Sequence, residues 1–199
     1  MLPSINKAMS TRWAAVFVIV GAGIAAALQV GKAAIAAPLL QSDFGIALTA
    51  IGWLAGIFAL VGLVGGIPTG AFVARFGARR ILIIGLLITT AGAALGAATL
   101  GLPILFSGRI VEGAGFLLVT VAAPSLLEEV TQPADRDLAF ALWSCFIPVG
   151  MATAMLVGPV FEDWRTMWWA SGAVALAMCM GVGLVIPAHG RNQFLSWSS

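Results

Sequence analysis

Six long apolar blocks, separated by short polar or glycine-rich connections, dominate the hydrophobic pattern of this chain. Each block is long enough to cross a hydrocarbon core of about 30 Å, which takes about 20 helical residues. Lipid offers the backbone no hydrogen-bond partner, and these runs lack the alternation of barrel strands. The pattern predicts an all-α membrane protein with six transmembrane helices, at Trp13 to Leu40, Ile46 to Val73, Ile81 to Leu100, Ile104 to Leu127, Leu138 to Val160 and Met167 to Ile186.

The composition narrows the class of protein further. Hydrophobic residues make up 61% of the 199 residues and charged residues 9%, roughly a third of the charged share of soluble domains. His189 is the single histidine and follows the last block, while Cys145 and Cys179 lie inside blocks five and six. This distribution indicates neither a metal site nor a catalytic set of serine, histidine and acid. We expect a protein that is not an enzyme, with no cofactor and no nucleic-acid partner.

The positions of the basic residues predict the orientation of the helices. If the N-terminus is cytoplasmic, Arg165 alone lies outside, Lys32 and Arg109 lie within spans, and all other cations are cytoplasmic. This distribution follows the positive-inside rule. We therefore expect residues 1–12 and the tail 187–199 to be cytoplasmic, on either side of a bundle at 13–186, in a bacterial inner membrane.

A faint internal repeat divides the six helices into two groups of three. The segment "AAPLLQSDF" (36–44) is similar to "AAPSLLEEV" (122–130), and Gly70 falls opposite Gly158 at almost the same offset. Because three is odd, the second unit must cross the membrane in the opposite sense, which gives two inverted three-helix repeats. Chance similarity in an alanine-rich chain is the alternative.

Small residues concentrate in the second block. Pro68 lies in this block, together with glycines at spacings that include four residues: Gly52, Gly56, Gly62, Gly65, Gly66 and Gly70. Glycine lets helices approach closely in lipid. Two interpretations stay open, namely tight static packing or a helix that slides or bends.

Three charged side chains, Lys32, Arg109 and Glu112, fall inside predicted spans, where a charge costs about 2.5 to 3.5 kcal/mol. Lys32 shares a helical face with Gln29. It either faces a central cavity, neutralising an anionic solute or alternating with a proton, or is a snorkelled or structurally paired lysine. Arg109 and Glu112 are three residues apart and can form an ion pair, or Glu112 exchanges protons beside Arg109.

Three short motifs occur along the chain: "GAFVARFGARR" at 70–80, Arg109 with Glu112, Gly113 and Gly115 in the fourth block, and Gly158 with Pro159 near the end of the fifth. They resemble three signatures of the major facilitator superfamily of secondary transporters, namely G-x-L-A-D-R-x-G-R-R, R-x-x-Q/E-G-x-G and a glycine series that ends in Gly-Pro. The resemblance covers Trp13 to Ile186 and one half of a family member, which has two six-helix bundles. It implies a conformational role for the matching residues and the arginine beside them: Gly70, Arg75, Gly77, Arg79, Arg80, Gly113, Gly115, Gly158 and Pro159, with Arg109 and Glu112 in the second signature.

One departure from the first signature concerns its aspartate, which is Ala74 in this chain. In the family this aspartate is understood to pair with cations near the cytoplasmic helix ends and to hold one conformation closed. Here a latch would have to use Glu128 and Glu129 against the three arginines of the turn. The alternative is that these arginines set the topology and contact anionic lipid head groups.

The resemblance implies movement of a small solute, either facilitated or coupled to protons, with an anion favoured by Lys32. Family members bind their substrate between two halves. A single half offers one wall, so we expect its in-span charges to face lipid unless a second bundle covers them. The second bundle is a second copy in a homodimer or a separately encoded C-terminal half. The remaining alternative is a truncated, transport-inactive half. The tail "AHGRNQFLSWSS" favours it, because it resembles the end of an interrupted reading frame.

Overall fold

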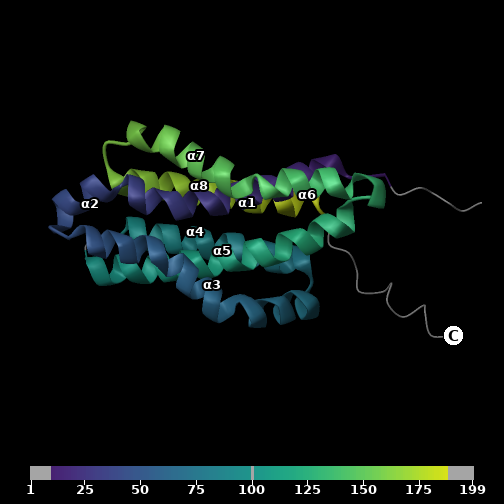
Figure 1. The fold of residues 1–199 in the computed structure, drawn as a ribbon, viewed down its shortest axis with the longest axis horizontal. Coiled ribbons are helices and arrows are strands. Elements are labelled where there is room, and N and C mark those ends of the chain that lie inside the picture. Colours follow the sequence, from purple (N-terminus) through teal and green to yellow (C-terminus); the bar gives the residue numbers. More distant parts are fainter. Residues whose placement is uncertain (1–9, 100, 188–199) are drawn as a thin grey trace, which may run out of the picture.

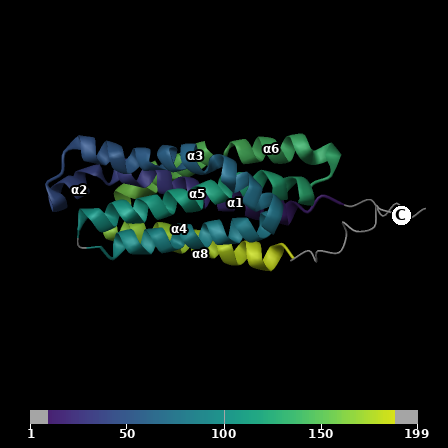
Figure 2. The same ribbon diagram turned by 90° about the horizontal axis from the view of Figure 1, so that it is seen from below.

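The computed structural model describes residues 10–99 and 101–187, and these residues form a bundle of helices (Figures 1 and 2). Six membrane-long helical segments are present there, which confirms the predicted all-α fold. The predicted N-terminal segment and tail lie almost entirely outside the described residues. In chain order the elements are α1 (Trp13–Ile35), α2 (Ala37–Phe44), α3 (Leu48–Phe76), α4 (Ala78–Ala97), α5 (Leu102–Val130), η1 (Pro133–Asp135), α6 (Arg136–Ser144), α7 (Phe146–Val157), η2 (Gly158–Val160) and α8 (Trp164–Val185).

The first and fifth spans are broken, which the sequence reading missed. The first span changes from α1 to α2 at Ala36, two residues before Pro38, and the fifth changes from α6 to α7 at Cys145, three residues before Pro148. Proline has no N–H, so the carbonyl four residues earlier loses its helical hydrogen bond. The expected unbroken helices over Trp13 to Leu40 and Leu138 to Val160 are therefore wrong in this respect.

Helix α3 continues through Pro68 and bends along its length, so that its second half leaves the line of α5 (Figure 1). Its large apolar side chains are far more exposed than those of the core, with Leu63 82% and Ile67 93% accessible. Five of its six glycines have open space around them, so tight packing within this bundle does not account for them, and movement of the helix stays a prediction.

The packing pairs agree with two inverted three-helix units. Helix α5 runs opposite to α1 (Figure 1), and α1 packs against α7 as α5 packs against α3. Exchanging the two units converts one of these pairs into the other, which is the relation expected of an inverted repeat. Helices α4 and α8 also pack together and complete the side of the bundle away from α3.

The start of α8 is fixed by polar contacts at one end of the bundle. The Asp163 carboxylate accepts a hydrogen bond from the Thr166 amide at 3.1 Å and caps the helix. Slight burial opposes ionisation, but hydrogen bonds from the Arg165 and Thr166 backbone hold the pKa of Asp163 below its ordinary value. Beside this cap, Asp43 of α2 accepts hydrogen bonds from the Trp164 indole at 2.8 Å and from Arg165 at 3.2 Å.

Glycine permits the close approach of α4 and α5, and this generates a prediction. A Cβ atom at Gly115 would lie 2.6 Å from the Gly85 carbonyl oxygen, whereas one at Gly56 would meet nothing within 4 Å. We expect Gly115→Ala to lower the free energy of unfolding by about 1 to 3 kcal/mol through overpacking. Gly56→Ala should be neutral or raise it by up to about 1 kcal/mol, because alanine favours the helix.

Circular dichroism in one detergent monitors the unfolding of the wild type and of both variants, and the three unfolding midpoints are compared. Equal midpoints for the two variants would contradict this account of the α4–α5 contact.

Candidate functional site

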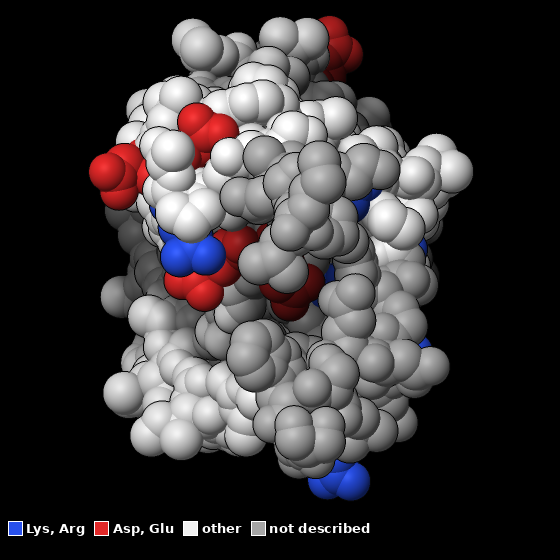
Figure 3. All heavy atoms as spheres, turned by 90° about the vertical axis from the view of Figure 1, so that its right-hand side faces the viewer, with Lys and Arg blue, Asp and Glu red and all other residues white. Residues whose placement is uncertain are grey.

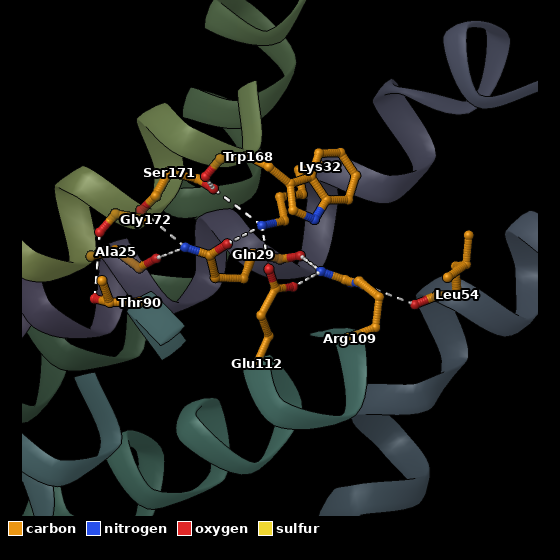
Figure 4. A network of polar contacts seen from close by, with 10 residues as sticks. All are labelled: Ala25, Gln29, Lys32, Leu54, Thr90, Arg109, Glu112, Trp168, Ser171 and Gly172. Atoms are coloured by element: carbon orange, nitrogen blue, oxygen red, sulfur yellow. Dashed lines mark hydrogen bonds and ion pairs between the residues drawn. The ribbon is translucent and has the colours of Figure 1, made fainter. Parts of the chain in front are cut away.

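Five polar side chains from three helices meet in the interior of the bundle and form what we call the buried polar network (Figure 4). Helix α1 supplies Gln29 and Lys32, helix α5 supplies Arg109 and Glu112, and helix α8 supplies Ser171. Ser171 is 8% accessible and the other four are 0 to 1% accessible. The network is therefore sealed from both lipid and water in this conformation.

Helical spacing places these groups opposite one another. Within α1 and within α5 the two polar residues are three positions apart, so each pair shares one face. The polar face of α5 reaches α1 and α8 because α4 lies very close behind it. A Cβ atom at Gly92 of α4 would lie 2.7 Å from the Glu112 backbone nitrogen.

The Glu112 carboxylate is the centre of the network. Its Oε1 atom lies 2.6 Å from Lys32 Nζ, and its Oε2 atom pairs with an Nη1 nitrogen of Arg109. The structure confirms the ion pair that the spacing of Arg109 and Glu112 predicts. It also settles the position of Lys32, which is a paired lysine in this conformation and does not face a cavity.

Lys32 has a full set of hydrogen-bond acceptors. Besides Glu112, its ammonium donates to Gln29 Oε1 at 2.5 Å and to Ser171 Oγ at 3.1 Å. The Ser171 hydroxyl in turn donates to the Trp168 carbonyl at 2.9 Å, and Lys32 Nζ lies 4.5 Å from the centre of the Trp168 ring. Three donors thus meet three acceptors, and the indole adds a cation–π contact.

Arg109 ties α5 to two other helices through their backbones. Its Nη1 atom donates to the Gln29 carbonyl at 2.8 Å and its Nε atom to the Leu54 carbonyl of α3 at 3.2 Å. The guanidinium carbon lies 4.4 Å from the centre of the Phe58 ring. Within the described residues the buried Nη2 atom has no hydrogen-bond partner.

The expectation that a lone half would leave these charges against lipid is wrong. Helix α8 covers Lys32 through Ser171 and Trp168, and a second hydrogen bond joins Gln29 to the Ser171 carbonyl at 3.1 Å. Arg109 lies under Leu54 and Phe58 of α3. Trp164 and Trp168 are core residues at 1% accessibility, whereas the neighbouring Trp169, at 53%, faces outward.

Ser171, Trp168 and Phe58 were not among the site residues expected from the sequence. Ser171 carried the clearest signal, because a serine stands in the middle of an otherwise apolar last block. No residue spacing could link it to Lys32, from which it is 139 positions away.

The arginine turn (Arg75, Arg79 and Arg80) lies at the end of the bundle where the described chain both starts and finishes (Figure 1), which is the end that faces the viewer in Figure 3. Arg79 donates to the carbonyls of Ile186 at 2.5 Å and Gly183 at 3.1 Å, and Arg12 donates to that of Val185 at 2.7 Å. Cations near a helix C-terminus satisfy its last carbonyls and its dipole. These contacts anchor the end of α8.

The acidic residues of the proposed latch lie near the end of α5. Glu128 and Glu129 are exposed there, and among the described residues no ion pair joins Glu128 to Arg75, Arg79 or Arg80. The latch therefore stays a prediction for another conformation.

The motif glycines serve different purposes. Gly77, at φ +88, makes the turn between α3 and α4 and needs the conformational freedom of glycine. At Gly113 and Gly115 the backbone of α5 packs against α3 and α4, while Gly158, just before Pro159, packs against Ile35 at the end of α1. Gly70 has open space around it and contributes no packing in the described part of the chain.

Six membrane-long helices, joined by short connections and enclosing an ionic network, define a multi-pass helical membrane protein. The family model described as Major Facilitator Superfamily matches residues 15–197, and the chain belongs to this family.

Curated relatives of the chain include transporters and resistance proteins. It is 29% identical to the puromycin resistance protein pur8 of Streptomyces alboniger, over 87% of this chain and 35% of that protein. It is 33% identical to a chloramphenicol resistance protein of Streptomyces lividans, over 76% and 39%. The galactose-proton symporter of Escherichia coli K12 is 24% identical, over 89% and 38%. The chain thus spans little more than a third of the length of these relatives.

The charge balance of the network predicts unequal effects on stability. Glu112→Gln would leave two buried cations without a counter-charge, and we expect it to lower the free energy of unfolding by about 3 to 5 kcal/mol. Lys32→Met leaves the Arg109–Glu112 pair balanced and should cost clearly less.

Both variants are compared with the wild type by titration with sodium dodecyl sulfate in mixed micelles. If the free energy of unfolding falls by the same amount in Glu112→Gln and Lys32→Met, the two cations do not depend on a single carboxylate.

Proposed function

We propose that this chain is one six-helix half of a secondary transporter, which moves a small solute across a bacterial inner membrane together with a second six-helix bundle. The observation that carries this proposal is the buried polar network at the centre of a family-matched bundle. Ionisable groups are expensive at membrane depth and typically belong to ion or proton pathways. A network that merely held three helices together would not require two cations and a carboxylate.

The printed names of the relatives favour transport and leave the solute open. One relative is called a galactose-proton symporter, another a probable actinorhodin transporter, and others puromycin and chloramphenicol resistance proteins. The earlier preference for an anionic solute depended on Lys32 facing a cavity, and Lys32 is enclosed. We therefore retain a small solute and proton coupling, and we assign the network to coupling.

A second copy of the chain is our candidate for the second bundle. In full-length family members the two halves are parallel repeats about an axis along the membrane normal. Two copies with the same orientation, with all their termini cytoplasmic, can adopt this relation. Exposed apolar side chains on α3 and α7 offer the contact surface, among them Ile67 at 93% and Leu156 at 78% accessibility.

Proteoliposomes holding the purified chain test this function. Puromycin, chloramphenicol and galactose are supplied as radiolabelled solutes under an imposed pH gradient, and the protein mass of the detergent particle is measured in parallel. We expect accumulation of at least one solute and a particle of two chains, each of 20.4 kDa.

Lys32→Met should remove accumulation, and Leu184→Ala, at an 87% accessible position on α8, is the matched control. A single-chain particle that moves no solute above protein-free liposomes would overturn the proposal in favour of a transport-inactive half. A single-chain particle whose transport appears once a separately encoded half is added would exclude self-pairing.

A further inference from the structure

The buried polar network contains more positive than negative charge. When all groups are ionised, Lys32 and Arg109 contribute two positive charges and Glu112 one negative charge, which leaves one excess positive charge in an enclosed site. An unbalanced charge is costly in a medium that excludes water. The site can become electrically neutral by losing one proton.

We propose that Lys32 is the group of this network that releases and takes up a proton, while Glu112 stays ionised between the two cations. This inference rests on the proposed function, because it assigns the proton step of a transporter. In the step, one N–H bond of the Lys32 ammonium breaks, the electron pair stays on Nζ, and the proton passes to a water molecule. The reverse step restores the ammonium.

The chemistry of the three charged groups singles out Lys32. An arginine guanidinium does not deprotonate in proteins, so Arg109 keeps its charge. Protonation of Glu112 would raise the excess from one positive charge to two, and it would weaken both ion pairs at once. Loss of a proton from Lys32 leaves Arg109 and Glu112 as a balanced pair. Lysine, unlike arginine, readily changes its protonation when it is buried.

The neighbours of Lys32 can serve both of its forms. The ammonium donates to Glu112, Gln29 and Ser171. An amine has two N–H donors and one lone pair, so it can still donate to Glu112 and Gln29 and accept from Ser171. The Ser171 hydroxyl makes this exchange by rotating its hydrogen from the Trp168 carbonyl to Nζ, atoms that lie 2.9 Å and 3.1 Å away.

The helices packed around Lys32 present the following groups to it. Helix α5 presents Arg109 and Glu112, and helix α8 presents Ser171 and Trp168. Gln29 is the polar neighbour on α1 itself. Helix α7 approaches through Ala154, which packs against Gly31. Within the described residues, Arg109 and Glu112 are thus the charged groups that act on Lys32.

Proton exchange with water requires the network to open, and the contacts show where. Lys32 is covered on one side by Ser171 and Trp168 of α8, through one hydrogen bond of 3.1 Å and one ring contact. Its bond to Glu112 is shorter and charge-assisted, at 2.6 Å. Separation of α8 from α1 therefore admits water to Nζ before the carboxylate is released.

The test uses nuclear magnetic resonance of the full chain in lipid nanodiscs. The sequence contains two lysines, Lys7 and Lys32, so Lys7→Arg leaves a single lysine for ¹⁵N labelling at Nζ. Spectra are recorded from about pH 6 to about pH 9, a range in which an unperturbed lysine stays an ammonium and an unperturbed glutamate stays ionised. We expect the Nζ signal to pass from ammonium to amine, with no infrared band of a protonated carboxyl group.

An Nζ signal that stays ammonium throughout this range would overturn the proposal. A pH-dependent infrared band of a protonated carboxyl group would also overturn the proposal if this band shifts in frequency in a folded Glu112→Asp variant. Glu112 would then carry the proton. These spectra require no transport. If Lys32 changes form while proteoliposomes move no solute, the transport function fails and the proton assignment stands. If solute accumulates while Lys32 stays an ammonium, the transport function stands and the proton assignment fails.

The Lys32→Met variant provides a second, functional readout. It should lose accumulation of solute driven by a pH gradient but retain exchange of solute between equal concentrations on the two sides. Lys32→Arg keeps a permanent charge and should also lose gradient-driven accumulation. Accumulation at the wild-type level in either folded variant would contradict the role of Lys32.

Discussion

The whole interior of this bundle depends on one carboxylate that serves two cations. Glu112 holds Lys32 of the first span and Arg109 of its own helix, and Arg109 extends the connection to backbone carbonyls of α1 and α3. Because hydrocarbon cannot solvate charge, both cations depend on this carboxylate for their counter-charge. Apolar surfaces alone would let these helices pack in several registers, and the polar contacts select one of them.

The bilayer imposes the second constraint, since every backbone polar group must find a partner within the protein. Prolines in the first and fifth spans break this rule locally and divide each span into two helices. The breaks fall at Ala36, directly after α1, and at Cys145, directly before α7, and they lie at different levels, because Phe146 meets Gly23 whereas Gly158 meets Ile35. Small residues complete the arrangement, because Gly92 and Gly115 let α4 and α5 approach until their backbones nearly touch.

Much of the fold was predictable from the sequence, because span length and hydrophobicity follow directly from the thickness of a membrane. The pairing of Arg109 with Glu112 was predictable for a similar reason, since it depends on helical spacing within one helix. What failed required knowledge of tertiary packing. Whether Lys32 faces a cavity or is a paired lysine stayed open, because its partners Ser171 and Trp168 lie on the last span.

Polar contacts bind helix α8 to the rest of the bundle at its start, its middle and its end. Asp43 of α2 accepts hydrogen bonds from Trp164 and Arg165 at the start, and Lys32 donates to Ser171 in the middle. Arg12 and Arg79 donate to the last carbonyls of the helix. The two ends of α8 are held by charged side chains, whereas its middle meets Lys32 through one hydrogen bond and one ring contact. The last span can therefore part from the first at its middle while both of its ends stay in place.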